Sequence, residues 1–149
     1  MKRSKGKLAL SILMVSLILL FIWGNSLLPA ELSQAFSDWV KNLLTGGASG
    51  EGSGGSGLLR KIAHFTEFAA LGMSLGWLFG MLRKNVSFPF LMGAAAACVD
   101  ETIQLFVPER GPGIFDVCLD TAGVAVGLLA LHIGYKLFKK KNNIILEEN

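Results

Sequence analysis

Apolar residues gather in four long stretches along this chain, and short polar or glycine-rich segments separate them. The stretches cover about residues 7–24, 58–82, 87–107 and 114–138. Each approaches the roughly 20 residues that an α-helix needs to cross the hydrocarbon core of a bilayer. The pattern therefore predicts an all-α membrane protein with four transmembrane helices.

The connection between the first two stretches has two unlike parts. Within residues 30–45, apolar residues recur at spacings of three and four, at Leu32, Ala35, Phe36, Trp39, Val40, Leu43 and Leu44. This spacing is typical of an amphipathic helix, which we expect to lie on the outer membrane surface. Residues 46–57 contain almost only glycine and serine, which predicts a flexible external linker.

Composition supports a membrane protein. Of the 149 residues, 52% are hydrophobic and 17% are charged, and the mean hydropathy is +0.52. These values are too apolar for an ordinary soluble domain. No small-residue cleavage motif follows the first stretch, so we expect it to stay attached as the first transmembrane helix.

Basic residues mark one side of the predicted bundle. They occur before the first stretch, at Arg83 and Lys84 between the second and third, and at residues 139–141 after the fourth. By the positive-inside rule that side is cytoplasmic, which places both termini inside and residues 25–57 outside. Residues 142–149 are expected to form a disordered cytoplasmic tail. The basic clusters flank apolar runs and are not interleaved with aromatic residues, so nucleic acid is not expected as a partner.

Charged residues interrupt the apolar stretches near their predicted outer ends. Arg60, His64 and Glu67 are spaced i, i+4 and i+7, which puts them on one helix face. Asp100 and Gln104 share a face of the next helix, and Glu101 points about 100° away from Asp100. We predict that these faces converge with the start of the fourth helix in one pocket, formed by Arg60, His64, Glu67, Asp100, Glu101, Gln104, Arg110, Asp116 and Asp120.

Small residues predict where helices pack closely. Gly72, Gly76 and Gly80 form a stripe on the second helix, on a different face from His64. Gly123 and Gly127 continue the face of Asp116 and Asp120 on the fourth helix. Such stripes let two helix backbones approach each other in a membrane.

Each charged residue also has a purely structural interpretation. Arg60 and Lys61 fit snorkelling anchors at the membrane interface. The whole cluster fits a network of interhelical hydrogen bonds and ion pairs. Asp100 and Glu101 are harder to explain in this way, because a buried carboxylate must be protonated, paired to Arg60 or Arg110, or bound to a cation.

No cofactor is predicted, and metal binding stays an open alternative. The oxygen-rich set with one imidazole would suit Mg²⁺, Ca²⁺ or Mn²⁺ better than a structural zinc ion. Its members are His64, Glu67, Asp100, Glu101, Asp116 and Asp120. No local ligand motif supports the assignment of a metal to any of them.

Three motifs in this order resemble the VanZ-like family of bacterial membrane proteins. They are His64-Phe65-x-Glu67-Phe68, then Asp100-Glu101-x-x-Gln104-Leu105-Phe106-x-Pro108-x-Arg110, then Asp116 with Gly123-x-x-x-Gly127. The chain departs from the family pattern at Phe68, where tyrosine is usual, at Glu109, where glycine often stands, and at Asp120, where asparagine is common. The resemblance implies one VanZ-like domain over residues 1–149, in the plasma membrane of a bacterium.

The resemblance implies a cell-envelope role connected with low-level resistance to the glycopeptide teicoplanin. Two functions are compatible with the residues. In the first, the outward-facing pocket binds a lipid-linked cell-wall precursor, another amphiphilic ligand or the glycopeptide. In the second, a membrane hydrolase or transferase acts on a lipid head group, with Glu67 or the pair Asp100 and Glu101 as base and His64 as proton carrier.

Overall fold

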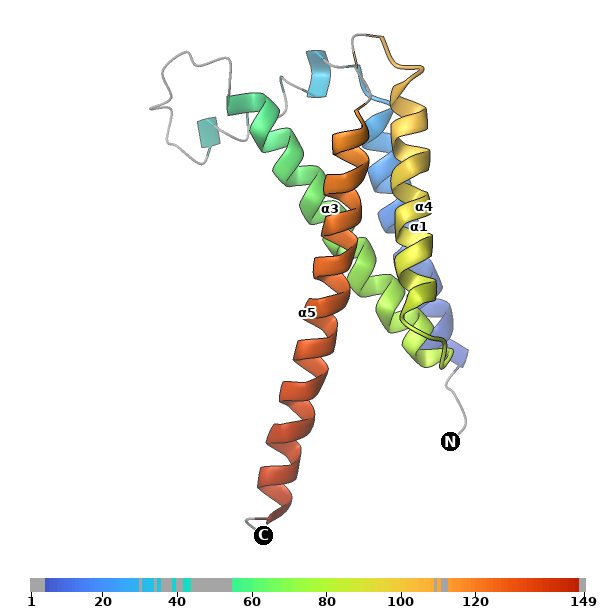
Figure 1. The fold of residues 1–149 in the computed structure, drawn as a ribbon, viewed down its shortest axis with the longest axis vertical. Coiled ribbons are helices and arrows are strands. Elements are labelled where there is room, and N and C mark those ends of the chain that lie inside the picture. The colour runs from blue at the N-terminus through green and yellow to red at the C-terminus, as the bar shows by residue number, and fades with distance from the viewer. Residues whose placement is uncertain are drawn as a thin grey trace.

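Four long helices follow the four apolar stretches in the computed structural model, which describes residues 5–29, 31–33, 35, 39, 42–43, 55–108, 110 and 113–147. They are α1 (Lys5–Ser26), α3 (Gly55–Met81), α4 (Ser87–Gln104) and α5 (Ile114–Glu147). No strand occurs among the described residues, which agrees with the all-α prediction. Successive helices alternate in direction, so the start of α1 and the end of α5 lie at one end of the bundle and the ends of α4 and α1 lie at the other (Figure 1).

Three of these helices are long and apolar enough to cross a membrane. They cover Lys5–Ser26, Gly57–Met81 and Ile114–Lys140, so the chain is a multi-pass membrane protein. The 18-residue helix α4 does not meet the same requirement, and the fourth span stays a prediction. Large apolar side chains are exposed on the outside of α1, α3 and α5, as expected of helices whose outer surfaces face lipid.

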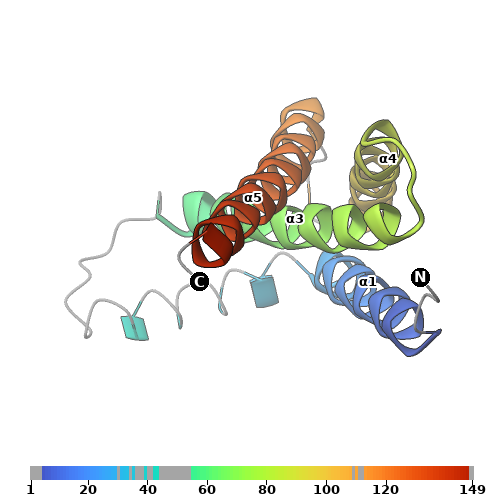
Figure 2. The same cartoon turned by 90° about the horizontal axis from the view of Figure 1, so that it is seen from below.

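Helix α3 is the centre of the bundle. It lies between α1 on one side and α4 and α5 on the other (Figure 2). Its buried side chains form a continuous core with those of all three neighbours, and this core includes Phe68, Leu71 and Leu75 of α3, Ile22 of α1, Ala97 of α4 and Val124 of α5. Residues on one face of α3 are therefore held at a fixed position relative to the other helices.

Glycines allow α3 and α5 to pack so closely that their backbones are in contact. A methyl group at Gly127 would collide with the carbonyl oxygen of Ala69, and one at Gly72 would collide with the backbone of Val124. Close packing was predicted at Gly72, Gly76 and Gly127, and the structure agrees there. The prediction is wrong for Gly80, which faces open space.

Several predicted boundaries are shifted. The first turn of α3 includes residues 55–57, which were expected to belong to the linker, and α4 ends three residues before position 107. Helix α5 continues to Glu147, so the prediction of a disordered tail is wrong for residues 142–147. The segment contains neither glycine nor proline and continues directly from a stable helix, which favours helical extension.

The external segment is described only in part. Residues 31–33, 35, 39 and 42–43 are helical. The rest of the predicted surface helix over residues 30–45 and the linker residues 46–54 lie outside the described residues. Both remain predictions.

Candidate functional site

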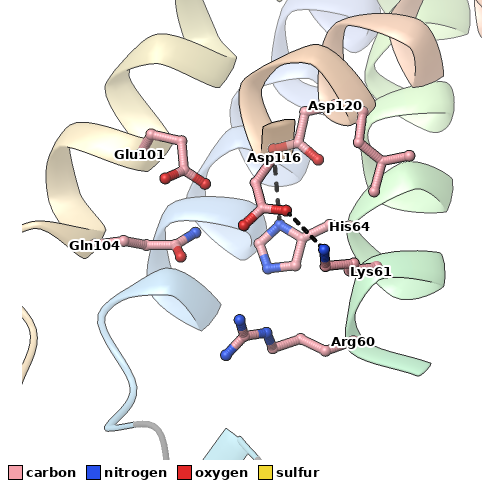
Figure 3. Close-up of a pocket in the computed structure, with 8 residues that line it drawn as sticks. Arg60, Lys61, His64, Glu101, Gln104, Asp116 and Asp120 are labelled. Atoms are coloured by element: carbon pink, nitrogen blue, oxygen red, sulfur yellow. Dashed lines mark ion pairs between the residues drawn. The ribbon is translucent and has the colours of Figure 1, made fainter. Parts of the chain in front are cut away.

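Polar side chains from three helices surround a small cavity at the end of the bundle where α1 ends and α5 begins (Figure 3). The cavity is lined by Arg60, Lys61 and His64 of α3, by Glu101 and Gln104 of α4, and by Asp116, Leu119 and Asp120 of α5. Its free volume of about 10 Å³ is close to the space that one water molecule needs. Six of the nine predicted pocket residues line it; Glu67, Asp100 and Arg110 do not.

His64 lies between two buried carboxylates. Its Nδ1 atom is 3.7 Å from Oδ2 of Asp100 and 4.0 Å from Oδ2 of Asp120. The three side chains come from α3, α4 and α5, and all three are buried. Asp100 does not line the cavity itself but lies beside His64, which does. This cluster of His64, Asp100 and Asp120 confirms that the three predicted faces converge.

Gln104 fixes the position of the Asp100 carboxylate. Its Nε2 atom donates a hydrogen bond of 2.8 Å to Oδ2 of Asp100, one turn earlier on α4. The same nitrogen is 3.4 Å from Oγ of Ser26 at the end of α1. Gln104 therefore links the cluster to a fourth helix.

Glu101 ties the connection between α4 and α5 to the end of the bundle. Its Oε2 atom accepts a hydrogen bond of 3.1 Å from the backbone N–H of Gly113, directly before α5. Its Oε1 atom is buried and has no hydrogen-bond partner among the described residues. The carboxylate thus has one oxygen in a structural contact and one oxygen free beside the cavity.

Arg110 contacts the backbone of α1 and does not line the cavity. Its Nη1 atom donates to the carbonyl oxygen of Ser26 at 2.9 Å, and Nη2 donates to that of Asn25 at 3.4 Å. Burial lowers the pKa of the Arg110 guanidinium, and the nearby positive charge of Arg60 lowers it further. An arginine remains charged even so. The prediction that Arg110 binds a ligand directly is not supported by this position.

Glu67 also points away from the cavity, toward α1. Its Oε1 atom accepts a hydrogen bond of 3.4 Å from Nδ2 of Asn25. Glu67 and His64 belong to the same predicted face, but Glu67 stands three positions after His64. At about 100° per residue this step turns its side chain by about 60° around the helix, toward α1. The helix spacing alone did not reveal this difference.

The two basic residues at the cavity differ in their pairing. Nζ of Lys61 lies 3.5 Å from Oδ1 of Asp116. The half-buried Arg60 has no carboxylate oxygen within 4.0 Å among the described residues. It extends from α3 past His64 (Figure 3). Arg60 is thus a guanidinium beside the cavity that is available to an anion.

Asn25 and Ser26 are the site residues that sequence reasoning missed. Both end α1, where they contact Glu67, Gln104 and Arg110. The sequence prediction ended the first apolar stretch at residue 24 and assigned both to the external segment of residues 25–57. A signal was present, because two hydrogen-bonding residues at the outer end of that helix lie at the depth of the other polar faces.

Comparison with known proteins gives a family match over most of the chain. The sequence pattern of the family described as VanZ/LLP1 matches residues 7–138. No curated protein and no solved structure matches the chain.

Proposed function

The chain belongs to the VanZ/LLP1 family, and from this premise we propose that it is a cell-envelope protein that binds the phosphate head group of a lipid-linked ligand. The observation that carries the proposal is the position of Arg60. Its guanidinium lines a polar cavity within the bundle and has no carboxylate within 4.0 Å among the described residues. A guanidinium with free donors binds phosphate oxygens in a bidentate geometry.

The head group binds at the mouth of the cavity, on Arg60 and Lys61. The interior of about 10 Å³ is too small for a phosphate group. Lys61 is half-exposed and its partner Asp116 is partly exposed, so this ion pair is weak and can open to a stronger anion. The apolar outer surfaces of the helices meet the lipid chain of the same ligand.

The pocket faces the outside of the cell in this proposal, and α4 completes a four-span bundle. The basic residues at the opposite end support this orientation by the positive-inside rule. Both termini are then cytoplasmic. An outward pocket of this kind binds a lipid-linked cell-wall precursor on the side of the membrane where a glycopeptide acts. Binding there occludes the precursor from teicoplanin, and in this proposal the occlusion gives low-level resistance.

Binding of a polyprenyl phosphate to the full chain in detergent tests the head-group proposal. We expect Arg60→Gln to weaken binding about 10-fold or more, because a charge-assisted hydrogen bond contributes about 1.5–3 kcal/mol. The matched control is Arg83→Gln, which removes an exposed arginine at the other end of the bundle. Equal affinity in Arg60→Gln and the wild type would refute the proposal.

The link to resistance is tested in cells. Arg60→Gln, Lys61→Gln and the variant with both changes are scored for protein level in the membrane and for teicoplanin susceptibility. Loss of resistance at normal protein level supports a functional site. Normal resistance in all three variants would contradict the proposed role.

A membrane enzyme is the second candidate, and the position of His64 favours it. An imidazole between two carboxylates is suited to carry a proton during hydrolysis or transfer on a lipid head group. Incubation of the protein with the polyprenyl phosphate, followed by mass spectrometry of the lipid, separates the two functions. Recovery of unchanged lipid supports binding, and a product that disappears in His64→Ala supports catalysis.

A further inference from the structure

Three buried side chains form a set of metal donors that the proposed head-group contacts of Arg60 and Lys61 do not use. We propose that Nδ1 of His64 and one carboxylate oxygen each of Asp100 and Asp120 bind a divalent metal ion of the Mn²⁺ or Zn²⁺ type. The inference does not depend on the lipid ligand. It rests on the geometry of the donors, on their burial and on the lack, among the described residues, of a lysine or arginine within 4.0 Å of either carboxylate.

The donor atoms are at distances that a metal ion can bridge. One ligand atom from each of the three residues lies within 4.8 Å of the other two. The distances from His64 Nδ1 to the two carboxylates are 3.7 and 4.0 Å. Donor atoms of a tetrahedral site with bonds of about 2.1 Å lie roughly 3.4 Å apart, so movements below about 1 Å would close the site.

Protein groups do not offset the cost of burying the carboxylates of Asp100 and Asp120. Asp100 is 0% exposed and Asp120 is 1% exposed. Oδ1 of Asp100 and both oxygens of Asp120 have no hydrogen-bond partner among the described residues. When both carboxylates are ionised they require a cation, because burial of an unpaired charge is strongly unfavourable.

Neighbouring basic residues do not supply this cation. Lys61 pairs with Asp116, and Arg110 donates to backbone carbonyls of α1. In the described part of the chain, His64 is the only basic side chain within 4.0 Å of either carboxylate. A metal ion supplies two positive charges and uses the free oxygens as ligands.

The donor set indicates the class of metal. Imidazole nitrogen suits Zn²⁺ and carboxylate oxygen suits Mn²⁺, and a set with both donors accommodates either ion. Three protein ligands leave at least one coordination position open. His64 and Asp120 also line the cavity, so its space for one water molecule adjoins this position. Gln104 stabilises the site as a donor to Asp100 Oδ2, in the manner of groups that orient metal ligands.

Metal titration of the purified full chain tests the inference. The protein is treated with a chelator in detergent, without added lipid, and titrated with Mn²⁺ while free Mn²⁺ is followed by electron paramagnetic resonance. Zn²⁺ is measured by competition. We expect one ion per chain, and binding reduced at least 10-fold in Asp120→Asn and abolished in His64→Ala with Asp120→Asn.

The control is Glu31→Gln, which removes an exposed carboxylate from the segment between α1 and α3 and leaves the cavity lining unchanged. It should bind Mn²⁺ like the wild type. A wild-type chain that binds no Mn²⁺ or Zn²⁺ at 100 μM would overturn the inference. A dissociation constant of 100 μM, about 5.5 kcal/mol of binding free energy, is taken as the upper limit for a specific site. Equal binding in the wild type and Asp120→Asn would overturn it as well.

A second measurement on the wild type covers the case in which the variants do not fold. Mn²⁺ bound to an imidazole gives a ¹⁴N modulation of the electron spin echo, and Mn²⁺ bound only by oxygen does not. The expected result is this modulation together with a higher thermal unfolding midpoint of the loaded protein. Bound Mn²⁺ without nitrogen modulation would contradict the site. Because no lipid is present, failure here leaves the head-group test at Arg60 unaffected.

Discussion

The guanidinium of Arg110 donates a hydrogen bond of 2.9 Å to the backbone carbonyl oxygen of Ser26, a residue 84 positions earlier in the chain. Ser26 is the last residue of α1, and the last carbonyls of a helix have no partner within it. The positive charge of Arg110 also lies at the negative end of the α1 dipole, where a cation is stabilising. Arg110 thus joins the connection between α4 and α5 to the end of the first helix.

Substitution Arg110→Ala is expected to destabilise the protein by about 3 kcal/mol, because it removes two charge-assisted hydrogen bonds and takes the Arg110 donor from the carbonyl oxygen of the buried Ser26. Arg110→Lys should have an intermediate effect, since it keeps the charge but loses the fork of donors. The thermal unfolding midpoint in detergent measures the effect. Arg83→Ala, which removes an exposed arginine, should leave the midpoint unchanged; a similar decrease in both would contradict the role of Arg110.

Gly127→Ala is expected to destabilise the contact of α3 with α5 by about 2 kcal/mol, because the new methyl group collides with the carbonyl of Ala69 and the backbones must separate. Gly134→Ala is the matched control on the same helix. Gly134 faces open space, and alanine favours a helix over glycine by up to about 1 kcal/mol, so this variant should be equally or more stable. If both substitutions lowered the unfolding midpoint, the close packing at Gly127 would not explain the effect, and the prediction would be wrong.

Glu67→Gln should be tolerated. Glutamine keeps an oxygen that accepts the hydrogen bond of Asn25 Nδ2, and Glu67 does not line the cavity. We expect membrane abundance and Mn²⁺ affinity within about two-fold of the wild type. Asp100→Asn is the comparison, and it should weaken Mn²⁺ binding at least 10-fold (about 1.4 kcal/mol). If both variants lose Mn²⁺ equally, Glu67 belongs to the metal-binding group.

The orientation in the membrane can be measured by cysteine labelling. Cys98 and Cys118 are free and exposed, so both are first replaced by alanine. A cysteine at Ser56 should then react with an impermeant maleimide in intact cells, and a cysteine at Lys139 should react only after lysis. Protection of the first site together with labelling of the second would reverse the proposed topology.

The faces of single helices could be predicted from sequence because they depend only on local geometry. Asp100 and Gln104 one turn apart, or Asp116 and Asp120, share a face in any α-helix, and the structure places them as expected. The relation between Asp100 and His64 was predicted only as convergence at one depth. Their distance of 3.7 Å depends on how α3 and α4 are tilted and rotated, which the spacing of residues does not determine.

The contacts of α1 could not be predicted for the same reason. Glu67 and Arg110 were placed in the pocket because their charges lie at the right depth. The structure places both against Asn25 and Ser26, because α3 lies between α1 and the other helices and the connection after α4 returns to α1. The depth of Asn25 and Ser26 indicated that they could reach the other polar faces, but the spacing of residues did not determine which side chains they contact.

The convergence of His64, Asp100 and Asp120 from three helices has a consequence for biosynthesis. Asp120 and the rest of α5 are the last part of the site to leave the ribosome. Until α5 inserts, Asp100 and His64 lie in a partial bundle without their third partner, and Gly72 lacks the backbone of Val124 against which it packs. A nascent chain that ends before residue 114 therefore lacks both the Asp120 carboxylate beside His64 and the backbone against which Gly72 packs, and only the final helix completes the site.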